Sequence, residues 1–347
     1  MLRLESRKIL FVGDLNQGTR SLMRAQKLKD LCDEVVALSN TPIPFIAGVH
    51  KPSFIARAFH KLRLPCDDAA INHLLQSLAH GTKRFDVLWI EKSCMLRPKT
   101  LKLLKHAFSD SCLISVSEDD MYAMHNRSRY YEACLPLYDA VFTTKTYNLE
   151  ELKKLGARRT EFFLDSYDEL LHRPLLDYSD IKAKDIDVSF VGTYEEERAE
   201  TIKWLVTQGV RIIVFGNGWS SLQNFHPNLE IQNRPVYGGE YVEIINRSKI
   251  NLGFLRKINR DQVTSRSMEI TGSAAFLLAE RTNRHMELFE EGIEADFFSS
   301  NEELLKKITE YLASPERLRY IGLAGRDRCI SSGYEMQEQI VAILNQI

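Results

Sequence analysis

Two series of short apolar runs constrain the fold of this 347-residue chain more than any other feature. Each run is rich in β-branched residues and is followed by a longer segment with helical periodicity, a pattern typical of strands buried on both faces of a parallel sheet. The pattern therefore predicts an α/β fold with two helix-covered parallel sheets. The first series occupies 8–12, 34–38, 85–90, 112–116, 139–143 and 160–164, and the second occupies 187–191, 211–215, 250–254 and 275–279.

A stretch at 172–187 separates the two series. It carries a proline and several charges and has no sustained periodicity, as expected of a linker. We therefore predict two α/β domains, residues 1–178 and 179–347, with the last helix as a candidate to pack back on the first domain. Because ligands of such sheets bind beyond the carboxyl ends of the strands, we expect the site in a cleft between the domains.

Charge and cysteine content limit the partners and the compartment. Lys+Arg is 46 and Asp+Glu is 47, which lacks the basic excess that nucleic-acid binding usually needs. The six cysteines form no CxxC pair, which favours reduced core cysteines in a cytosolic protein. The N-terminus lacks the pattern of a signal peptide, and no run approaches the ~20 apolar residues that span a bilayer. We expect a cytoplasmic protein with no nucleic-acid partner.

The segment 261–280 carries the most chemistry. It predicts a short helix, a tight turn of small residues and a buried strand. Asp261 and Glu269 have seven residues between them, and Thr264 and Arg266 lie in that interval. A helix N-terminus attracts phosphate, and a carboxylate one or two turns further on can hold sugar hydroxyls. The segment therefore predicts a site that grips a nucleotide sugar.

The alternative for the two acids is a solvated helix face. It is weakened because Glu269 directly precedes the small, apolar stretch 270–275. A charge so close to a packed turn usually has a partner, and here that partner is Arg266 or a ligand.

Two loops that follow strands of the second series contain glycine. Gly192 and Thr193 come after the strand at 187–191, and Arg198 lies on the first turn of the next helix. Glycine lets a backbone approach a phosphate closely, and an arginine can pair with a diphosphate. The alternative is an ordinary strand-to-helix turn with a surface arginine.

The second glycine loop, after the next strand, contains Gly216, Asn217, Gly218 and Trp219. Two glycines and an indole at the carboxyl end of a strand can form a wall on which a base stacks. The alternative is a loop whose Trp219 is buried in the core.

The first half of the chain lacks a dinucleotide-binding fingerprint. The loop 13–20 contains glycine without the GxGxxG spacing, and the strand at 34–38 ends without an acid for a ribose. A dinucleotide-binding dehydrogenase is therefore disfavoured.

Candidates for a general base follow the fourth predicted strand, where Glu118, Asp119 and Asp120 are adjacent. Clustered carboxylates raise one another's pKa, which suits a general base. The alternative is a helix N-terminus stabilised by acids. His125 and His172 are further candidates, although a single histidine is more often structural than catalytic.

Residues 51–63 predict a basic amphipathic helix. Its apolar residues, among them Phe54 and Phe59, share one face, and its lysines and arginines lie off that face. Such a helix can lie on an anionic membrane surface. An ordinary helix packed on the sheet is the alternative.

The second half resembles the C-terminal domain of family-1-like glycosyltransferases of the spore-maturation-protein (CgeB) type. The resemblance covers roughly 185–335 and is carried by 189–193 with Arg198, 216–219, 263–280 with Thr282, 285–292, 302–304 and 325–328. It is weaker before 185, where Asp119-Asp120, 138–143 and 172–174 are similar to the first domain of family members.

The resemblance implies the GT-B fold, in which two Rossmann-like domains with parallel sheets face one another, the second binding the donor and the first the acceptor. It implies metal-independent transfer from a nucleotide-activated sugar, without a cofactor. Asp261 and Glu269 match the Glu-x7-Glu pair of many retaining members, whose second acid holds the ribose and whose first lies near the donor sugar. Aspartate at the first position leaves retention or inversion open. Arg198 and Arg266 would neutralise the diphosphate leaving group.

We therefore expect a glycosyltransferase whose acceptor is a glycan or lipid-linked glycan of a bacterial surface polysaccharide. The acceptor is expected over Asn16, Asp119 and Asp120, with Asp119 or Asp120 as the base if the enzyme inverts. Peripheral membrane contact through 51–63 is a further expectation. A sugar-nucleotide epimerase of the same fold and a catalytically degenerate binding or assembly subunit stay open. The residues expected to bind the donor are Gly192, Thr193, Arg198, Gly216, Asn217, Gly218, Thr264, Arg266 and Glu269, with Asp261 near the reacting sugar.

Overall fold

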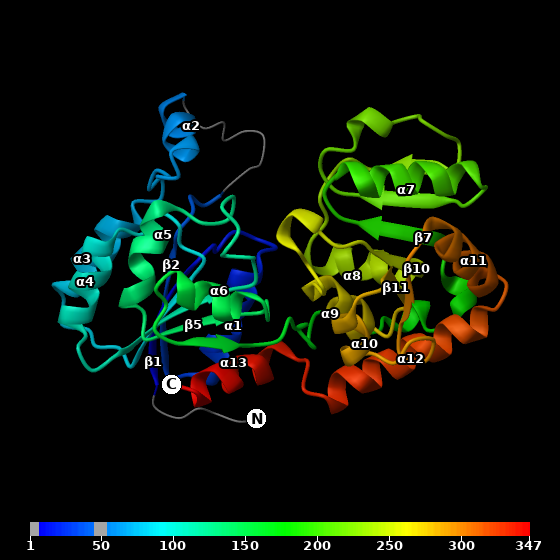
Figure 1. Ribbon diagram of the computed structural model, residues 1–347. Helices are drawn as coiled ribbons and strands as arrows, with labels where there is room; N and C mark the ends of the chain where they lie inside the picture. Colours follow the sequence, from blue (N-terminus) through cyan, green and yellow to red (C-terminus); the bar gives the residue numbers. More distant parts are fainter. Residues whose placement is uncertain (1–6, 45–53) are drawn as a thin grey trace. The chain divides into compact units, whose positions relative to one another are not determined.

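The computed structural model describes residues 7–44 and 54–347. The chain divides into two compact units, each built on its own sheet (Figure 1). Unit 1 comprises Met1–Leu164 and Gln337–Ile347, and unit 2 comprises Asp165–Met336.

The sheet of unit 1 has six parallel strands in the order β2-β1-β3-β4-β5-β6. Its strands are β1 (Lys8–Gly13), β2 (Glu34–Ser39), β3 (Val87–Glu91), β4 (Cys112–Ser117), β5 (Ala140–Thr143) and β6 (Thr160–Phe162). Its helices are α1 (Arg20–Leu31), α2 (Phe54–Lys61), α3 (Ile71–Ala79), α4 (Pro98–Ala107), α5 (Arg129–Cys134), α6 (Asn148–Lys154) and α13 (Met336–Asn345), with the 3-10 turn η1 (Leu135–Leu137).

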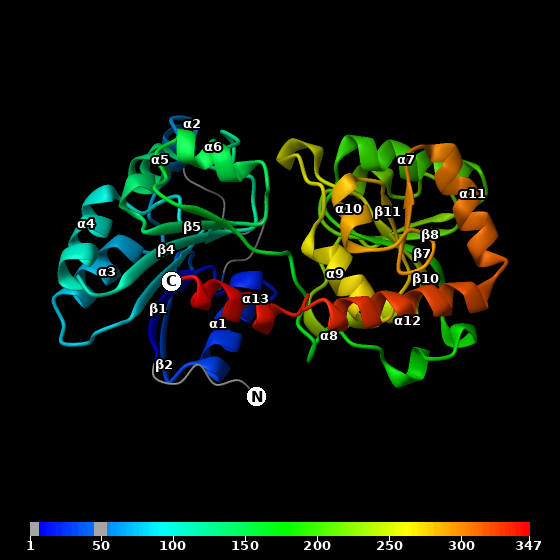
Figure 2. The ribbon, with the colours of Figure 1, turned by 60° about the horizontal axis from the view of Figure 1, so that its bottom comes forward.

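The central strands of unit 1 are buried on both faces, as their apolar runs predict. Leu10 and Leu88 pack with α3, α4 and α5 on one face. Trp89 and Phe11 stack on the other face, with ring centroids 6.4 Å apart. Helices α1 and α13 lie on that second face (Figures 1 and 2). Because side chains alternate along a strand, this two-sided burial requires an almost continuous apolar sequence.

The sheet of unit 2 also has six parallel strands, in the order β12-β11-β10-β7-β8-β9. Its strands are β7 (Ile186–Val191), β8 (Ile212–Phe215), β9 (Leu229–Ile231), β10 (Ser248–Gly253), β11 (Leu277–Glu280) and β12 (Asp296–Phe298). Its helices are α7 (Glu196–Thr207), α8 (Gly238–Arg247), α9 (Ser265–Gly272), α10 (Asn283–Leu288), α11 (Asn301–Leu312) and α12 (Pro315–Ser331). Its 3-10 turns are η2 (Leu176–Tyr178), η3 (Ile181–Ala183), η4 (Ser220–Leu222) and η5 (Lys257–Asn259).

Two strands of unit 2, β9 and β12, were not predicted from the sequence. Strands β9 and β12 have three residues each and form the two edges of the sheet. Edge strands are often short and need no long apolar run, because neighbours cover them on one side only. The internal strands were found because burial on both faces demands such a run.

The division between the units lies after Leu164 and not at the predicted 178–179. The segment that follows Leu164 is bonded to unit 2: the Tyr167 N–H donates to Tyr334 O at 3.2 Å, and the Leu175 N–H donates to Asn246 Oδ1 at 2.9 Å. These bonds make the charged, aperiodic stretch part of unit 2 rather than a free linker.

The last helix, α13, belongs to unit 1. The Leu164 N–H donates to Gln339 Oε1 at 3.0 Å, and Arg7 Nη1 donates to Leu344 O at 2.7 Å. Unit 1 is therefore assembled from two separate parts of the chain.

All six cysteines are free thiols, and Cys32, Cys134 and Cys329 are buried. Within the described ranges, no helix combines the length and the apolar character that crossing a bilayer requires.

Candidate functional site

The carboxyl ends of β7 and β8 are held together by the two predicted glycine loops. The Gly192 N–H donates to Phe215 O at 2.8 Å, and a Cβ on Gly216 would lie 2.0 Å from Gly192 O. Gly216 also has a φ of +143°, which side chains disfavour. Glycine at position 216 is thus required by the crossing of the two loops.

Trp219 is fully buried, and its Nε1–H donates to Gly192 O at 2.8 Å. Its ring packs edge-on against Phe190 and Tyr194. The structure supports the interpretation of Trp219 as a core residue. The prediction that Trp219 forms a wall on which a base stacks is wrong.

Three predicted donor residues stay on the surface of these loops. Thr193, Asn217 and Gly218 are exposed, and Asn217 O accepts the Tyr194 N–H at 2.9 Å. Their exposure leaves them open to a ligand at the carboxyl ends of β7 and β8.

Arg198 on the first turn of α7 is only 5% exposed and lacks a hydrogen-bonded counterion. Its Nη1 donates to Thr193 O at 3.2 Å, while Nε and Nη2 have no hydrogen-bond partner among the residues that the structure describes. Glu195 Oε2 lies 3.6 Å from Nη2, and Glu195 Oε1 accepts a bond from Arg256 at 2.9 Å. Burial, aided by repulsion from Arg266 and Arg256, lowers the pKa of Arg198 to about 10.

Arg266 brings a second cation to the same place. It lies on the first turn of α9, 5.8 Å from the centre of the Phe190 ring, and Arg198 lies 5.7 Å from the same centre. Arg266 makes no ion pair within the described part of the chain. Two guanidinium groups against one ring, beside the N-terminus of α9, form a site that an anion would stabilise.

Asp261 and Glu269 are placed differently from one another. Helix α9 begins at Ser265, so Glu269 lies on the helix and Asp261 lies in the preceding loop, where its N–H donates to Arg256 O at 3.2 Å. Both acids are half-buried. Thr264 is the N-cap residue of α9, and its side chain makes no capping bond.

Glu280 at the end of β11 is a site residue that the sequence analysis missed. Its Oε2 accepts the Leu255 N–H at 3.0 Å, and Lys257 and Arg198 interact with it electrostatically. Burial raises the pKa of Glu280 despite these partners. The sequence does contain an indication of this residue, because Glu280 is an acid that directly follows the predicted buried strand at 275–279.

A pocket in unit 1 lies at the carboxyl ends of β1, β3 and β4. Asp119 lines it and forms an ion pair with Lys92 at 2.6 Å. Asp120 is fully buried, and its Oδ1 accepts bonds from Asn148 Nδ2 at 2.8 Å and from the Tyr122 N–H at 3.2 Å. Asp120 therefore holds the loop and is not placed to accept a proton from a ligand.

Asn16 does not line this pocket, contrary to expectation. Its Nδ2 donates to Asp14 Oδ1 at 2.8 Å and to Pro42 O at 3.0 Å, which ties two loops together. Asp14 and Thr41 are the neighbouring residues that reach the pocket.

Glu118 has a lowered pKa, so the expectation that clustering would raise it is wrong. Burial alone would raise the pKa of Glu118, but Arg20 and Arg24 offset that effect and bring it to about 2. Arg24 Nη1 lies 2.9 Å from Glu118 Oε1, and Arg24 Nε bonds to Glu91. Arg24 and Glu91 are each 4% exposed and were not foreseen, because they are far apart in the sequence.

The histidine candidates are not part of this pocket. His172 is buried, and its Nδ1 accepts the Asp168 N–H at 3.0 Å. His125 lines a separate hollow with Arg63 and Cys94.

Comparison with known proteins identifies the architecture. Residues 197–345 match the family model described as glycosyl transferase-like. No curated protein matches the chain. Sucrose-phosphate synthase from Thermosynechococcus elongatus superposes with a TM-score of 0.66 at 12% identity, over 98% of this chain and 99% of that one. The fold is GT-B.

Two further GT-B structures were solved with nucleotides. Anabaena HepE in complex with UDP-glucose has a TM-score of 0.64 at 12% identity, over 98% of this chain and 100% of that one. An α-glucosyltransferase in complex with UDP and a 13-mer DNA has a TM-score of 0.65 at 13% identity, with the same coverage. The predicted fold class is confirmed, and the roles of individual residues stay predictions.

Proposed function

We propose that this GT-B protein is a glycosyltransferase that moves a sugar from a nucleotide-activated donor to a hydroxyl group of an acceptor. The observation that carries the proposal is Arg198, a buried cation with two unbonded nitrogen atoms, beside Arg266. A buried charge without a partner is costly, and a diphosphate supplies both the charge and the hydrogen-bond acceptors.

On this proposal, the donor binds at the carboxyl ends of β7, β8 and β11. Arg198 and Arg266 bond to the diphosphate, and Glu269 on α9 accepts bonds from the ribose. As the sugar leaves, negative charge grows on the terminal phosphate, and the two arginines stabilise it without a metal. Asp261 lies in the loop before α9 and is proposed to approach the donor sugar.

The unit 1 pocket is the proposed acceptor site, and its bonding pattern indicates the chemistry of the acceptor. The cations that line it are already paired: Arg20 and Arg24 with Glu118, and Lys92 with Asp119. An acceptor with a phosphate at this point would find no unpaired cation among the described residues that line the pocket. A hydroxyl-rich glycan can instead donate to the carboxylates of Asp14 and Asp119. Asp119 is the proposed base if the enzyme inverts.

Membrane contact is proposed for helix α2. Within residues 54–62, Phe54 is 84% exposed, Phe59 44% and Leu62 54%, while residues 51–53 lie outside the described chain. Exposed apolar groups next to Lys61 and Arg63 suit an anionic membrane that carries a lipid-linked glycan. Loss of binding to anionic vesicles in a Phe54→Asp, Phe59→Asp variant is expected, and unchanged binding would overturn this part of the proposal.

The central test uses purified protein and a panel of nucleotide sugars, beginning with UDP-glucose. We expect one donor to raise the melting temperature by mass action and to release its nucleoside diphosphate when acceptor is added. The Arg198→Met variant is expected to lose both effects. Arg211→Met is the matched control, because Arg211 lies on the surface and pairs with Asp187.

The outcome separates three functions. Acceptor-dependent release of the nucleotide supports a glycosyltransferase of the CgeB type acting on surface polysaccharide. Conversion of the donor into its epimer without acceptor indicates an epimerase, and binding without turnover indicates an assembly subunit. Donor binding that Arg198→Met leaves unchanged would show that the site is wrongly assigned.

A further inference from the structure

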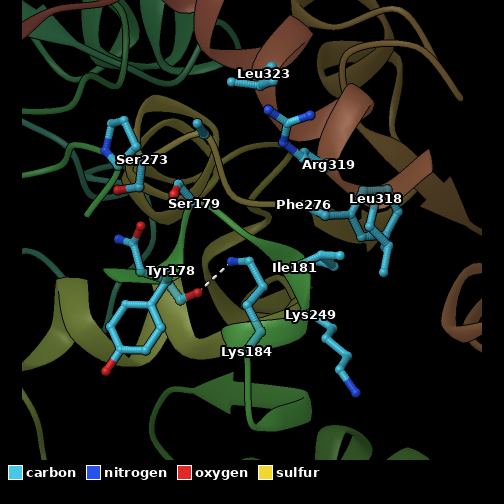
Figure 3. Close-up of a pocket in the computed structure, with 13 residues that line it drawn as sticks. Tyr178, Ser179, Ile181, Lys184, Lys249, Ser273, Phe276, Leu318, Arg319 and Leu323 are labelled. Atoms are coloured by element: carbon cyan, nitrogen blue, oxygen red, sulfur yellow. Dashed lines mark hydrogen bonds between the residues drawn. The ribbon is translucent and has the colours of Figure 1, made fainter. Parts of the chain in front are cut away.

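A pocket of unit 2 lies at the end of the sheet opposite to the proposed donor residues, where the strands begin (Figure 3). It is lined by η3, by the starts of β10 and β11 and by the first half of α12. Ile181, Phe276, Leu318 and Leu323 supply its apolar wall. The proposed donor residues, at the other ends of the strands, do not line it.

Lys184 is the polar group at the centre of this pocket (Figure 3). Its Nζ donates to Asn246 O and, at 3.3 Å, to Ser248 O, two carbonyl groups at the end of α8. An ammonium group has three N–H donors, so one remains for a ligand. Burial lowers the pKa of Lys184 to about 8, and no carboxylate of the described residues forms an ion pair with it.

The other charges around the pocket are also positive. Lys249 is balanced by Asp187 at 2.7 Å, and its side chain runs away from the other labelled residues (Figure 3). Arg319 on α12 is exposed and makes no ion pair within residues 7–44 and 54–347. In the described part of the chain, no aspartate or glutamate lines the pocket. Lys184 and Arg319, neither of which forms an ion pair within the described residues, thus lie beside an apolar wall.

We propose that this pocket binds a small carboxylate with an apolar body, such as a short acyl chain. The carboxylate would bond to Lys184 and Arg319, and the chain would pack on Phe276, Leu318 and Leu323. Pairing with an anion offsets the cost of the partly buried ammonium group, and burial of the chain removes apolar surface from water. The inference is independent of the proposed donor and acceptor sites.

Octanoate serves as the probe, measured by titration calorimetry on the full chain. We expect octanoate to bind, while acetate, which lacks the apolar body, and 1-octanol, which lacks the charge, bind at least ~10-fold more weakly. Lys184→Met and Arg319→Gln are each expected to weaken octanoate binding by roughly tenfold. Lys182→Met, an exposed lysine two residues from Lys184, is the matched control and should bind as the wild type does.

A measurement on the unmutated protein guards against misfolding of Lys184→Met, which loses two bonds to α8. Octanoate should slow acetylation of the Lys184 amine, followed by mass spectrometry, and leave acetylation of Lys182 unchanged. If octanoate protects neither lysine, or if Arg319→Gln and Lys184→Met both bind it like the wild type, the inference is wrong and Lys184 serves only to cap α8.

Discussion

Two buried arginines, Arg24 in unit 1 and Arg198 in unit 2, are 4% and 5% exposed, yet their surroundings are opposite. Arg24 bonds to both Glu91 and Glu118. Burial lowers the pKa of Arg24, but the two carboxylates raise it by more, so the pKa lies above its ordinary value. Among the described residues, Arg198 has no hydrogen-bonded carboxylate and two unbonded nitrogen atoms, and burial lowers its pKa. Equal burial therefore does not mean an equal role. Carboxylates of the fold form hydrogen bonds with Arg24, whereas two nitrogen atoms of Arg198 remain available for a ligand.

The same contrast extends to the two sites. In the unit 1 pocket, ion pairs occupy the lining cations, so the free capacity lies with carboxylate oxygens and suits hydroxyl donors. At the carboxyl ends of the unit 2 strands, Arg198 and Arg266 leave free donors that suit phosphate. This difference is our reason for proposing the acceptor site in unit 1 and the donor site in unit 2.

The largest expected effect is on the paired arginine. Arg24→Met should lower the free energy of unfolding by about 3–5 kcal/mol, because Glu91 is left buried without its charge partner. Urea denaturation measures the change. Lys83→Met, which breaks a surface pair with Glu34, should leave the free energy of unfolding almost unchanged, because solvent screens exposed ion pairs. If the two variants lose similar stability, Arg24 is not the structural member of the comparison.

Arg198→Met should weaken ligand binding without lowering the stability of the protein. We expect UDP to bind at least ~30-fold more weakly, corresponding to the loss of a buried charged contact. The free energy of unfolding without ligand should not fall, because the buried charge that is removed has no hydrogen-bonded counterion among the described residues. Calorimetry and urea denaturation on one sample check both statements. A marked loss of stability with unchanged UDP affinity would reverse the assignment.

The pairing in unit 1 also predicts a dependence of stability on pH. The folded-state pKa of Glu118 is about 2, below the usual 4.5, so the unfolded state binds more protons in between. This contribution to stability is fully present above pH 4.5 and is lost as the pH falls toward 2. Urea midpoints between pH 5 and pH 3 should fall less steeply in Glu118→Gln than in the wild type. Parallel slopes would show that the ion pairs do not set the pKa.

The smallest effect is expected at the second donor cation. Arg266→Gln should weaken UDP binding by roughly tenfold, because Arg266 is only half-buried and water compensates part of the loss. Fluorescence or calorimetric titration with UDP measures it. A loss larger than that of Arg198→Met would make Arg266 the principal phosphate contact and would sharpen the comparison between the two units.

Local features of the sequence predicted much of unit 2. The helix, turn and strand of 261–280 appear in that order as α9, the turn at Ser273–Ala274 and β11. Arg266 and Glu269 share one helix, so their proximity follows from helical spacing alone. Edge strands β9 and β12 have three residues each and were missed, whereas β6, a three-residue edge strand of unit 1, was predicted within the run at 160–164.

The amino-acid sequence alone determined the α/β class and the internal strands of both sheets, because burial on two faces requires a local apolar run. It also determined the positions of the donor candidates, because these residues directly follow the predicted strands or lie on the helix after them. Only the tertiary structure decided which charges meet. Arg24 lies 67 residues from Glu91 and 94 from Glu118 along the chain, and no local pattern reports such a contact. Packing also made Asp120 a loop support, Trp219 a core residue and Arg198 a buried cation without a hydrogen-bonded counterion among the described residues, since burial depends on neighbours that the fold alone brings together.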